Sequence, residues 1–102
     1  MRVLMVCSGG MSSAIVVKAI EKEAKAQGIE MVVKAVGTGE FEDEAKNGWD
    51  VLLVAPQVRH RMPVFEGVAK ELNLPIAVIS PQGYSPLGGK IVLEEIKKLK
   101  KM

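Results

Sequence analysis

The chain of 102 residues contains one cysteine, Cys7, and the residues that follow it are small and polar. Cys7 ends the apolar run at residues 3–6 and precedes the sequence Ser-Gly-Gly-Met-Ser-Ser. The backbone N–H groups of such a glycine-rich loop, together with the positive end of a following helix, bind anions and stabilise a thiolate. Because the thiolate is the nucleophilic form of cysteine, this pattern predicts attack on a phosphoryl group.

A purely structural explanation of Cys7 also exists, because a free cysteine at a strand end often only fills the core. One cysteine cannot form an internal disulfide or a cysteine-based zinc site, and His60 is the only histidine, so we expect no metal and no cofactor. We favour the nucleophile, because the strand end, the glycine-rich loop and the helix start occur together and packing does not require this combination.

Apolar runs alternate with amphipathic segments along the whole chain. The apolar runs predict strands at residues 3–6, 31–36, 51–55 and 76–79. The amphipathic segments predict helices at residues 14–27, 41–46, 62–72 and 90–100. This alternation is typical of an α/β domain with a parallel sheet and helices on both faces, and the length predicts a single domain over residues 1–102. Ligands of such sheets bind beyond the carboxyl ends of the strands, where Cys7 lies.

The composition narrows the classes of partner. The chain is 48% hydrophobic and 25% charged, as in an ordinary globular protein, and its net charge is only +2. With 4% aromatic residues and that small net charge, we expect no nucleic-acid partner. The apolar run at residues 3–6 is too short for a signal peptide or a membrane span, so we expect a cytoplasmic protein without direct membrane insertion.

Three segments together resemble the enzyme IIB components of the lactose/cellobiose/chitobiose class of the sugar phosphotransferase system. CSGGMSSA at residues 7–14 is similar to that family's CSAGMSTS loop, and DVLLVAPQV at residues 50–58 is similar to its DVVLLGPQI segment. Tyr84 with the downstream GGKIVLEEIKK is similar to the family's last loop and helix. The resemblance covers nearly the whole chain. It implies a four-stranded parallel sheet in the order 2-1-3-4, similar to that of low-molecular-weight tyrosine phosphatases.

The resemblance also implies a phosphotransferase function. Cys7 would accept a phosphoryl group from a phosphohistidine of enzyme IIA and pass it to a sugar bound by the membrane enzyme IIC, through which the chain would be peripheral to the membrane. The sugar would be a β-disaccharide such as cellobiose, chitobiose or lactose. The phosphoryl oxygens would be held by Ser8, Gly9, Gly10, Met11, Ser12 and Ser13. The residues that would border the site are Gln57, His60 and Tyr84.

Two positions depart from the family's pattern. His60, where relatives often have Tyr, lies between Arg59 and Arg61, and Gly88 replaces the usual Asp or Asn of the last loop. The segment Arg59-His60-Arg61 has three open interpretations, in order of preference: a solvated basic turn, a docking patch, or a supplement to phosphate binding.

Two rival functions follow from the same loop. Low-molecular-weight tyrosine phosphatases carry Cys, five residues and Arg, but Ser13 fills the Arg position here and residues 80–89 contain no Asp that could act as a general acid. Without the guanidinium that stabilises the transferred phosphoryl group, hydrolysis should be poor. The other rival is a non-catalytic, stand-alone regulatory module that binds phosphate and has lost its partners. The CSGGMSS segment is intact, which argues against such a decay of the site.

Overall fold

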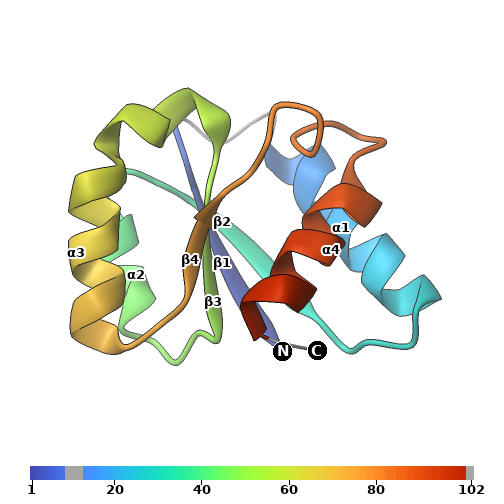
Figure 1. Cartoon of the computed structure of the whole chain (residues 1–102), viewed down its shortest axis with the longest axis horizontal. Coiled ribbons are helices and arrows are strands. Elements are labelled where there is room, and N and C mark those ends of the chain that lie inside the picture. The colour runs from blue at the N-terminus through green and yellow to red at the C-terminus, as the bar shows by residue number, and fades with distance from the viewer. Residues whose placement is uncertain (9–12, 101–102) are drawn as a thin grey trace.

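Four parallel strands form the central sheet of the structure, a computed structural model that describes residues 1–8 and 13–100. The strands are β1 (Arg2–Cys7), β2 (Val32–Gly37), β3 (Val51–Val54) and β4 (Ile76–Val78). Their order in the sheet is β2-β1-β3-β4, which confirms the order that the resemblance implied. Because β1 pairs with both β2 and β3, the strand that carries Cys7 lies in the interior of the sheet (Figure 1).

The helices lie on both faces of this sheet, as expected. They are α1 (Ser13–Ala26), α2 (Phe41–Ala45), α3 (Met62–Leu72) and α4 (Gly89–Lys100). Figure 1 shows α2 and α3 on one side of the sheet and α1 with α4 on the other. The described chain is therefore a three-layer α/β structure, and every strand but β4 is followed by a helix within a few residues.

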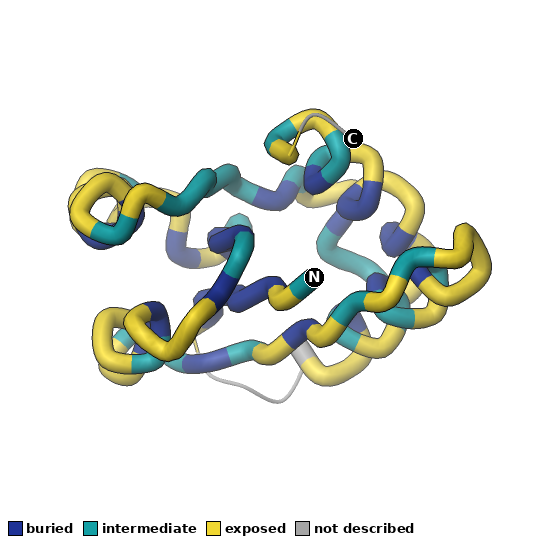
Figure 2. The backbone as a smooth tube through the Cα atoms, turned by 90° about the horizontal axis from the view of Figure 1, so that it is seen from below, coloured by how far each residue is buried: buried dark blue, intermediate teal, exposed yellow. Residues whose placement is uncertain are grey.

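The apolar strand runs fill two cores, one on each face of the sheet. Leu4 and Val6 point into a core with α2 and α3, which we call the α2/α3 cluster. Val3 and Met5 point into the other core, the α1/α4 cluster. Successive side chains of a strand point to opposite faces, so a strand covered on both sides must be apolar throughout. All four side chains are fully buried, and Figure 2 shows the buried backbone at the centre of the molecule.

The segment after β3 was assigned neither a helix nor a strand from the sequence. In the structure residues Pro56–Arg61 form a 3₁₀ helix, η1, with a kink at Val58. Pro56 stands at its first position, where the fixed φ of proline suits a helical turn. Val58 N–H donates to Ala55 O at 3.1 Å. The proline thus ends the strand and also begins the next element.

Because the sheet is parallel, the carboxyl ends of all four strands meet along one edge, which we call the carboxyl edge. In register, Cys7 lies beside Gly37, and Val54 lies beside both Val6 and Val78. The connections that leave this edge lead into α1, α2, η1 and the loop before α4. Residues far apart in the sequence therefore approach Cys7 from several connections.

Candidate functional site

Cys7 is the last residue of β1 and lies at the carboxyl edge. Its side chain is only 2% exposed and belongs to the α2/α3 cluster. The thiol donates a hydrogen bond to Val36 O of β2, with 3.6 Å between sulfur and oxygen. This bond needs the proton of the thiol, so it is lost when the sulfur becomes a nucleophilic thiolate.

The burial of Cys7 does not by itself distinguish a nucleophile from a residue that fills the core. Its position does point to function, because the carboxyl edge of an open α/β sheet is where ligands bind. The next residue, Ser8, is exposed, so the chain passes from core to surface within one residue of the sulfur. Cys7 is thus the last buried residue of β1 before the chain reaches the surface.

Only part of the expected phosphoryl-binding loop falls in the described residues. Ser8 follows β1, and Ser13 is the first residue of α1, one position earlier than expected. Gly9, Gly10, Met11 and Ser12 lie outside the described residues, as does the side chain of Ser13. The loop nevertheless joins a strand end to a helix start, which is the arrangement that binds anions.

The 3₁₀ helix η1 brings Gln57 and His60 to the carboxyl edge. Val58, at its centre, is buried in the same α2/α3 cluster as Cys7. Gln57 and His60 are exposed, as are Arg59 and Arg61. One buried side chain therefore anchors η1 to the core beside β1, and the polar side chains around it face solvent.

Tyr84 lies in the loop that leads from β4 to α4. Its backbone N–H donates to Ser80 O at 3.0 Å, and its side chain packs against both core clusters. Tyr84 Oη is buried and has no hydrogen-bond partner among the described residues. A phenol hydroxyl usually has a partner when it is buried. Tyr84 therefore offers an unused donor near the end of the sheet.

Gly88 holds this loop in a tight shape. A Cβ atom at Gly88 would lie 2.2 Å from Gly83 O and 2.7 Å from Gln82 O. Both obstacles are backbone atoms, so no side chain could be accommodated by a change of rotamer. A side chain at this position would therefore require the backbone of the loop to move.

Two carboxyl groups have shifted pKa values. Hydrogen bonds from Lys34 and then Asn47 lower the pKa of Glu44, on α2, to about 2. Burial raises the pKa of Glu95, on α4, although a hydrogen bond with Ser80 opposes the shift. Glu95 thus packs next to the residue at which the last loop begins.

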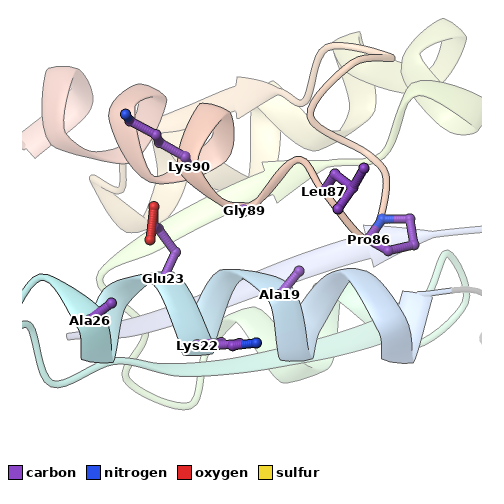
Figure 3. Close-up of a pocket in the computed structure, with 8 residues that line it drawn as sticks. All are labelled: Ala19, Lys22, Glu23, Ala26, Pro86, Leu87, Gly89 and Lys90. Atoms are coloured by element: carbon purple, nitrogen blue, oxygen red, sulfur yellow. The ribbon is translucent and has the colours of Figure 1, made fainter.

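A groove of about 270 Å³ lies between α1 and α4 (Figure 3). Pro86, Leu87 and Gly89 contribute to one wall, and Ala19 and Ala26 of α1 contribute to the other. None of the expected site residues lines it. The groove is therefore separate from the Cys7 site.

Comparison with known proteins decides the family. The family model described as "PTS system, Lactose/Cellobiose specific IIB subunit" matches residues 2–95. The chain belongs to this family. A similar curated protein is the "PTS system oligo-beta-mannoside-specific EIIB component" of Bacillus subtilis (strain 168). It is 27% identical over 94 residues, which make up 92% of this chain and 90% of that protein.

Two solved IIB structures share the fold. The lactose-specific IIB domain from Streptococcus pneumoniae has a TM-score of 0.77 and 26% identity, with 92% of this chain and 95% of that one covered. The solution structure of the cellobiose-specific IIB protein from Borrelia burgdorferi has a TM-score of 0.75 and 32% identity, with coverages of 99% and 93%. The matches confirm the resemblance noted in the sequence.

Membership of this family makes the chain an IIB-type component of sugar phosphotransfer, which works together with IIA and IIC components. Among the described residues, no helix is both long enough and apolar enough to cross a membrane.

Proposed function

We propose that Cys7 is the phosphorylated residue of this IIB component. It takes a phosphoryl group from a phosphohistidine of enzyme IIA and passes it to a β-disaccharide held by the membrane enzyme IIC. The observation that carries this proposal is the position of Cys7 at the carboxyl end of an interior strand, directly before the loop that begins α1. Residues 1–102 then act as one cytoplasmic IIB domain, held at the membrane only through enzyme IIC.

The chemistry consists of two displacements at phosphorus. The thiol gives to solvent the proton that it now donates to Val36 O, and the thiolate attacks the phosphorus of the phosphohistidine. The S–P bond forms as the N–P bond breaks, and the imidazole nitrogen that leaves takes up a proton from solvent. In the second step a sugar hydroxyl attacks the phosphorus and gives its proton to solvent, and the S–P bond breaks to release the Cys7 thiolate. Phosphoryl transfer of this kind depends mostly on positioning and on stabilising charge.

The proposed phosphoryl ligands are the main-chain N–H groups of residues 8–13, with the hydroxyls of Ser12 and Ser13 as further donors. Gln57, His60 and Tyr84 border the same edge. The buried hydroxyl of Tyr84 supports this assignment, because a phosphoryl oxygen would supply the acceptor that it lacks among the described residues.

A carrier fits this chain better than a phosphatase. Ser13 stands where a phosphatase has Arg, and the loop at residues 80–89 contains no Asp. Attack by water therefore lacks the loop guanidinium that would stabilise the transferred phosphoryl group and the Asp that would take the proton of the water. A slow loss of the phosphoryl group is what a carrier needs.

The test is intact-mass analysis after incubation with phosphoenolpyruvate, the general phosphotransferase proteins and an enzyme IIA protein of this class. We expect one added phosphoryl group on the wild type and none on Cys7→Ser. Omission of enzyme IIA is the control for direct labelling by the earlier proteins. Circular dichroism should show that Cys7→Ser remains folded, because the substitution changes one atom.

A further inference from the structure

Asn47 and Gly48 form the only Asn-Gly pair in the chain. They follow α2, and both residues are exposed. Gly48 has a left-handed φ of 85°, which residues with a Cβ rarely adopt. Among the described residues, the N–H of Gly48 has no hydrogen-bond acceptor and Oδ1 of Asn47 has no donor. The main-chain nitrogen that follows this amide is therefore free to react.

The other asparagine, Asn73, provides a contrast in the same chain. It is also exposed, but it precedes Leu74, and a bulky side chain at that position hinders ring closure onto the asparagine. The N–H of Leu74 also donates to Ala69 O at 2.9 Å, so this nitrogen is held at the C-terminal end of α3. Both asparagines are thus accessible to water, and Asn47 alone precedes an unhindered nitrogen.

We propose that Asn47 is a site of spontaneous deamidation, with the chain itself as the substrate and water as the second reactant. The nitrogen of Gly48 attacks Cγ of Asn47, so that a new C–N bond forms and the bond from Cγ to Nδ2 breaks. Ammonia leaves with the proton that the Gly48 nitrogen gives up through solvent, and a succinimide ring remains. Water then opens the ring at either carbonyl, and its second proton goes to the ring nitrogen. Residue 47 becomes aspartate or isoaspartate.

The side chain of Asn47 belongs to a hydrogen-bond network around Glu44. Asn47 Nδ2 donates to Glu44 Oε2 at 3.0 Å, and Trp49 Nε1 donates to the same oxygen at 3.3 Å. Lys34 Nζ pairs with Glu44 Oε1 at 2.7 Å. Deamidation replaces the donor at residue 47 by a second carboxylate, and a negative charge is unfavourable both beside Glu44 and after the C-terminal end of α2. The reaction therefore weakens this network.

The main chain of the same two residues is held by Arg2 of β1. Arg2 Nη1 donates to Asn47 O and to Gly48 O, each at 3.1 Å, and Arg2 Cζ lies 4.5 Å from the centre of the Trp49 ring. These contacts lie at the end of the sheet where Figure 1 marks the N-terminus. In isoaspartate the main chain runs through Cβ and Cγ and is one atom longer, which shifts Gly48 relative to Arg2. The modification thus loosens the contact between the beginning of β1 and the segment that leads into β3.

The experiment is to store the purified chain at mildly alkaline pH and physiological temperature and to map its peptides by mass spectrometry over time. Digestion in H₂¹⁸O distinguishes conversion during storage from conversion during digestion. Isoaspartate is measured by methylation with a protein isoaspartyl methyltransferase. Conversion at Asn47 should be at least about tenfold faster than at Asn73, because glycine has no Cβ to hinder ring closure. Gly48→Ala should slow conversion at Asn47 and leave Asn73 unchanged.

Two variants test the consequence for stability. Asn47→Asp reproduces one of the two products, and Asn47→Gln keeps an amide at the same position, so the pair isolates the added charge. Urea unfolding at neutral pH, followed by the fluorescence of Trp49, should give a lower midpoint for Asn47→Asp than for Asn47→Gln. Stored wild type should contain a second population that unfolds at lower urea, and stored Asn47→Gln should not.

The outcomes separate the site from its effect. Equal conversion at Asn47 and Asn73 would overturn the proposed site. So would a lack of conversion at Asn47 over the time in which the chain unfolded in urea converts. Equal midpoints for Asn47→Asp and Asn47→Gln would overturn the effect on stability. None of these outcomes depends on the role of Cys7, which lies at the opposite end of β1.

Discussion

Replacement of Gly88 by alanine tests how the last loop is built. An ideal Cβ at this position lies 2.2 Å from Gly83 O, about 0.8 Å short of the 3.0 Å that real Cβ contacts keep. Gly88 N–H also donates to Ser85 O, and Gly88 O accepts from Val92 N–H, so both sides of the residue are held. The loop must therefore shift as a unit to admit the methyl group.

Overpacking of a close contact costs about 1–3 kcal/mol. We expect the upper part of this range, about 2–3 kcal/mol, because the obstacles at Gly88 are backbone atoms. For a domain of this size the corresponding fall in Tm is about 10–20 °C. Gly67→Ala is the matched control. Its Cβ would meet nothing within 4 Å inside α3, so the substitution should stabilise by about 0.5–1 kcal/mol.

Urea unfolding followed by tryptophan fluorescence measures both effects, because Trp49 is the only tryptophan and is buried. Opposite signs for the two glycine substitutions would support the packing described for the loop. A free energy of unfolding for Gly88→Ala within about 0.5 kcal/mol of the wild type would refute it.

Three further predictions concern charge and chemistry. Because the pKa of Glu44 is lowered from 4.5 to about 2, its carboxylate stabilises the fold above pH 4.5, and this contribution is lost as the pH falls through about 2. Glu44→Gln should therefore flatten the acid dependence of the urea midpoint. Burial raises the pKa of Glu95, so the folded state becomes less stable as the pH rises above 4.5 and this carboxyl group ionises. Glu95→Gln should therefore raise the urea midpoint at pH 7 but not below pH 4.5. Hydrolysis of an aryl phosphate should stay far below about 1 per second, and turnover at or above that rate would favour the phosphatase.

The fold could be predicted because its core is built from simple patterns. Residues 3–6 and 51–54 are apolar throughout, as strands covered on both faces must be, and the sheet buries all of them. The helix at residues 62–72 was predicted with its observed bounds, and Asn73 ends it with a left-handed φ of 57°. The order of the strands came from the family resemblance, since periodicity does not specify which strands pair.

The site could be predicted only in outline. The strand-end position of Cys7 followed from local sequence, but its hydrogen bond to Val36 O depends on the register between β1 and β2. The 3₁₀ helix was missed because it has no long hydrophobic period, although Pro56 at its first position was a usable signal. The close contact of Gly88 with Gly83 could not be predicted from the sequence, because it depends on how the last loop folds back on itself.

The most direct test of the central claim is ³¹P NMR of the chain after enzyme IIA-dependent phosphorylation, combined with mapping of the labelled peptide. We expect a single signal typical of a phosphorothiolate, on the peptide that contains Cys7, and no signal from Cys7→Ser. A phosphoramidate signal that survives Cys7→Ser and maps to His60 would contradict the account, because the phosphoryl group would then be carried by η1 and Cys7 would be a residue of the core.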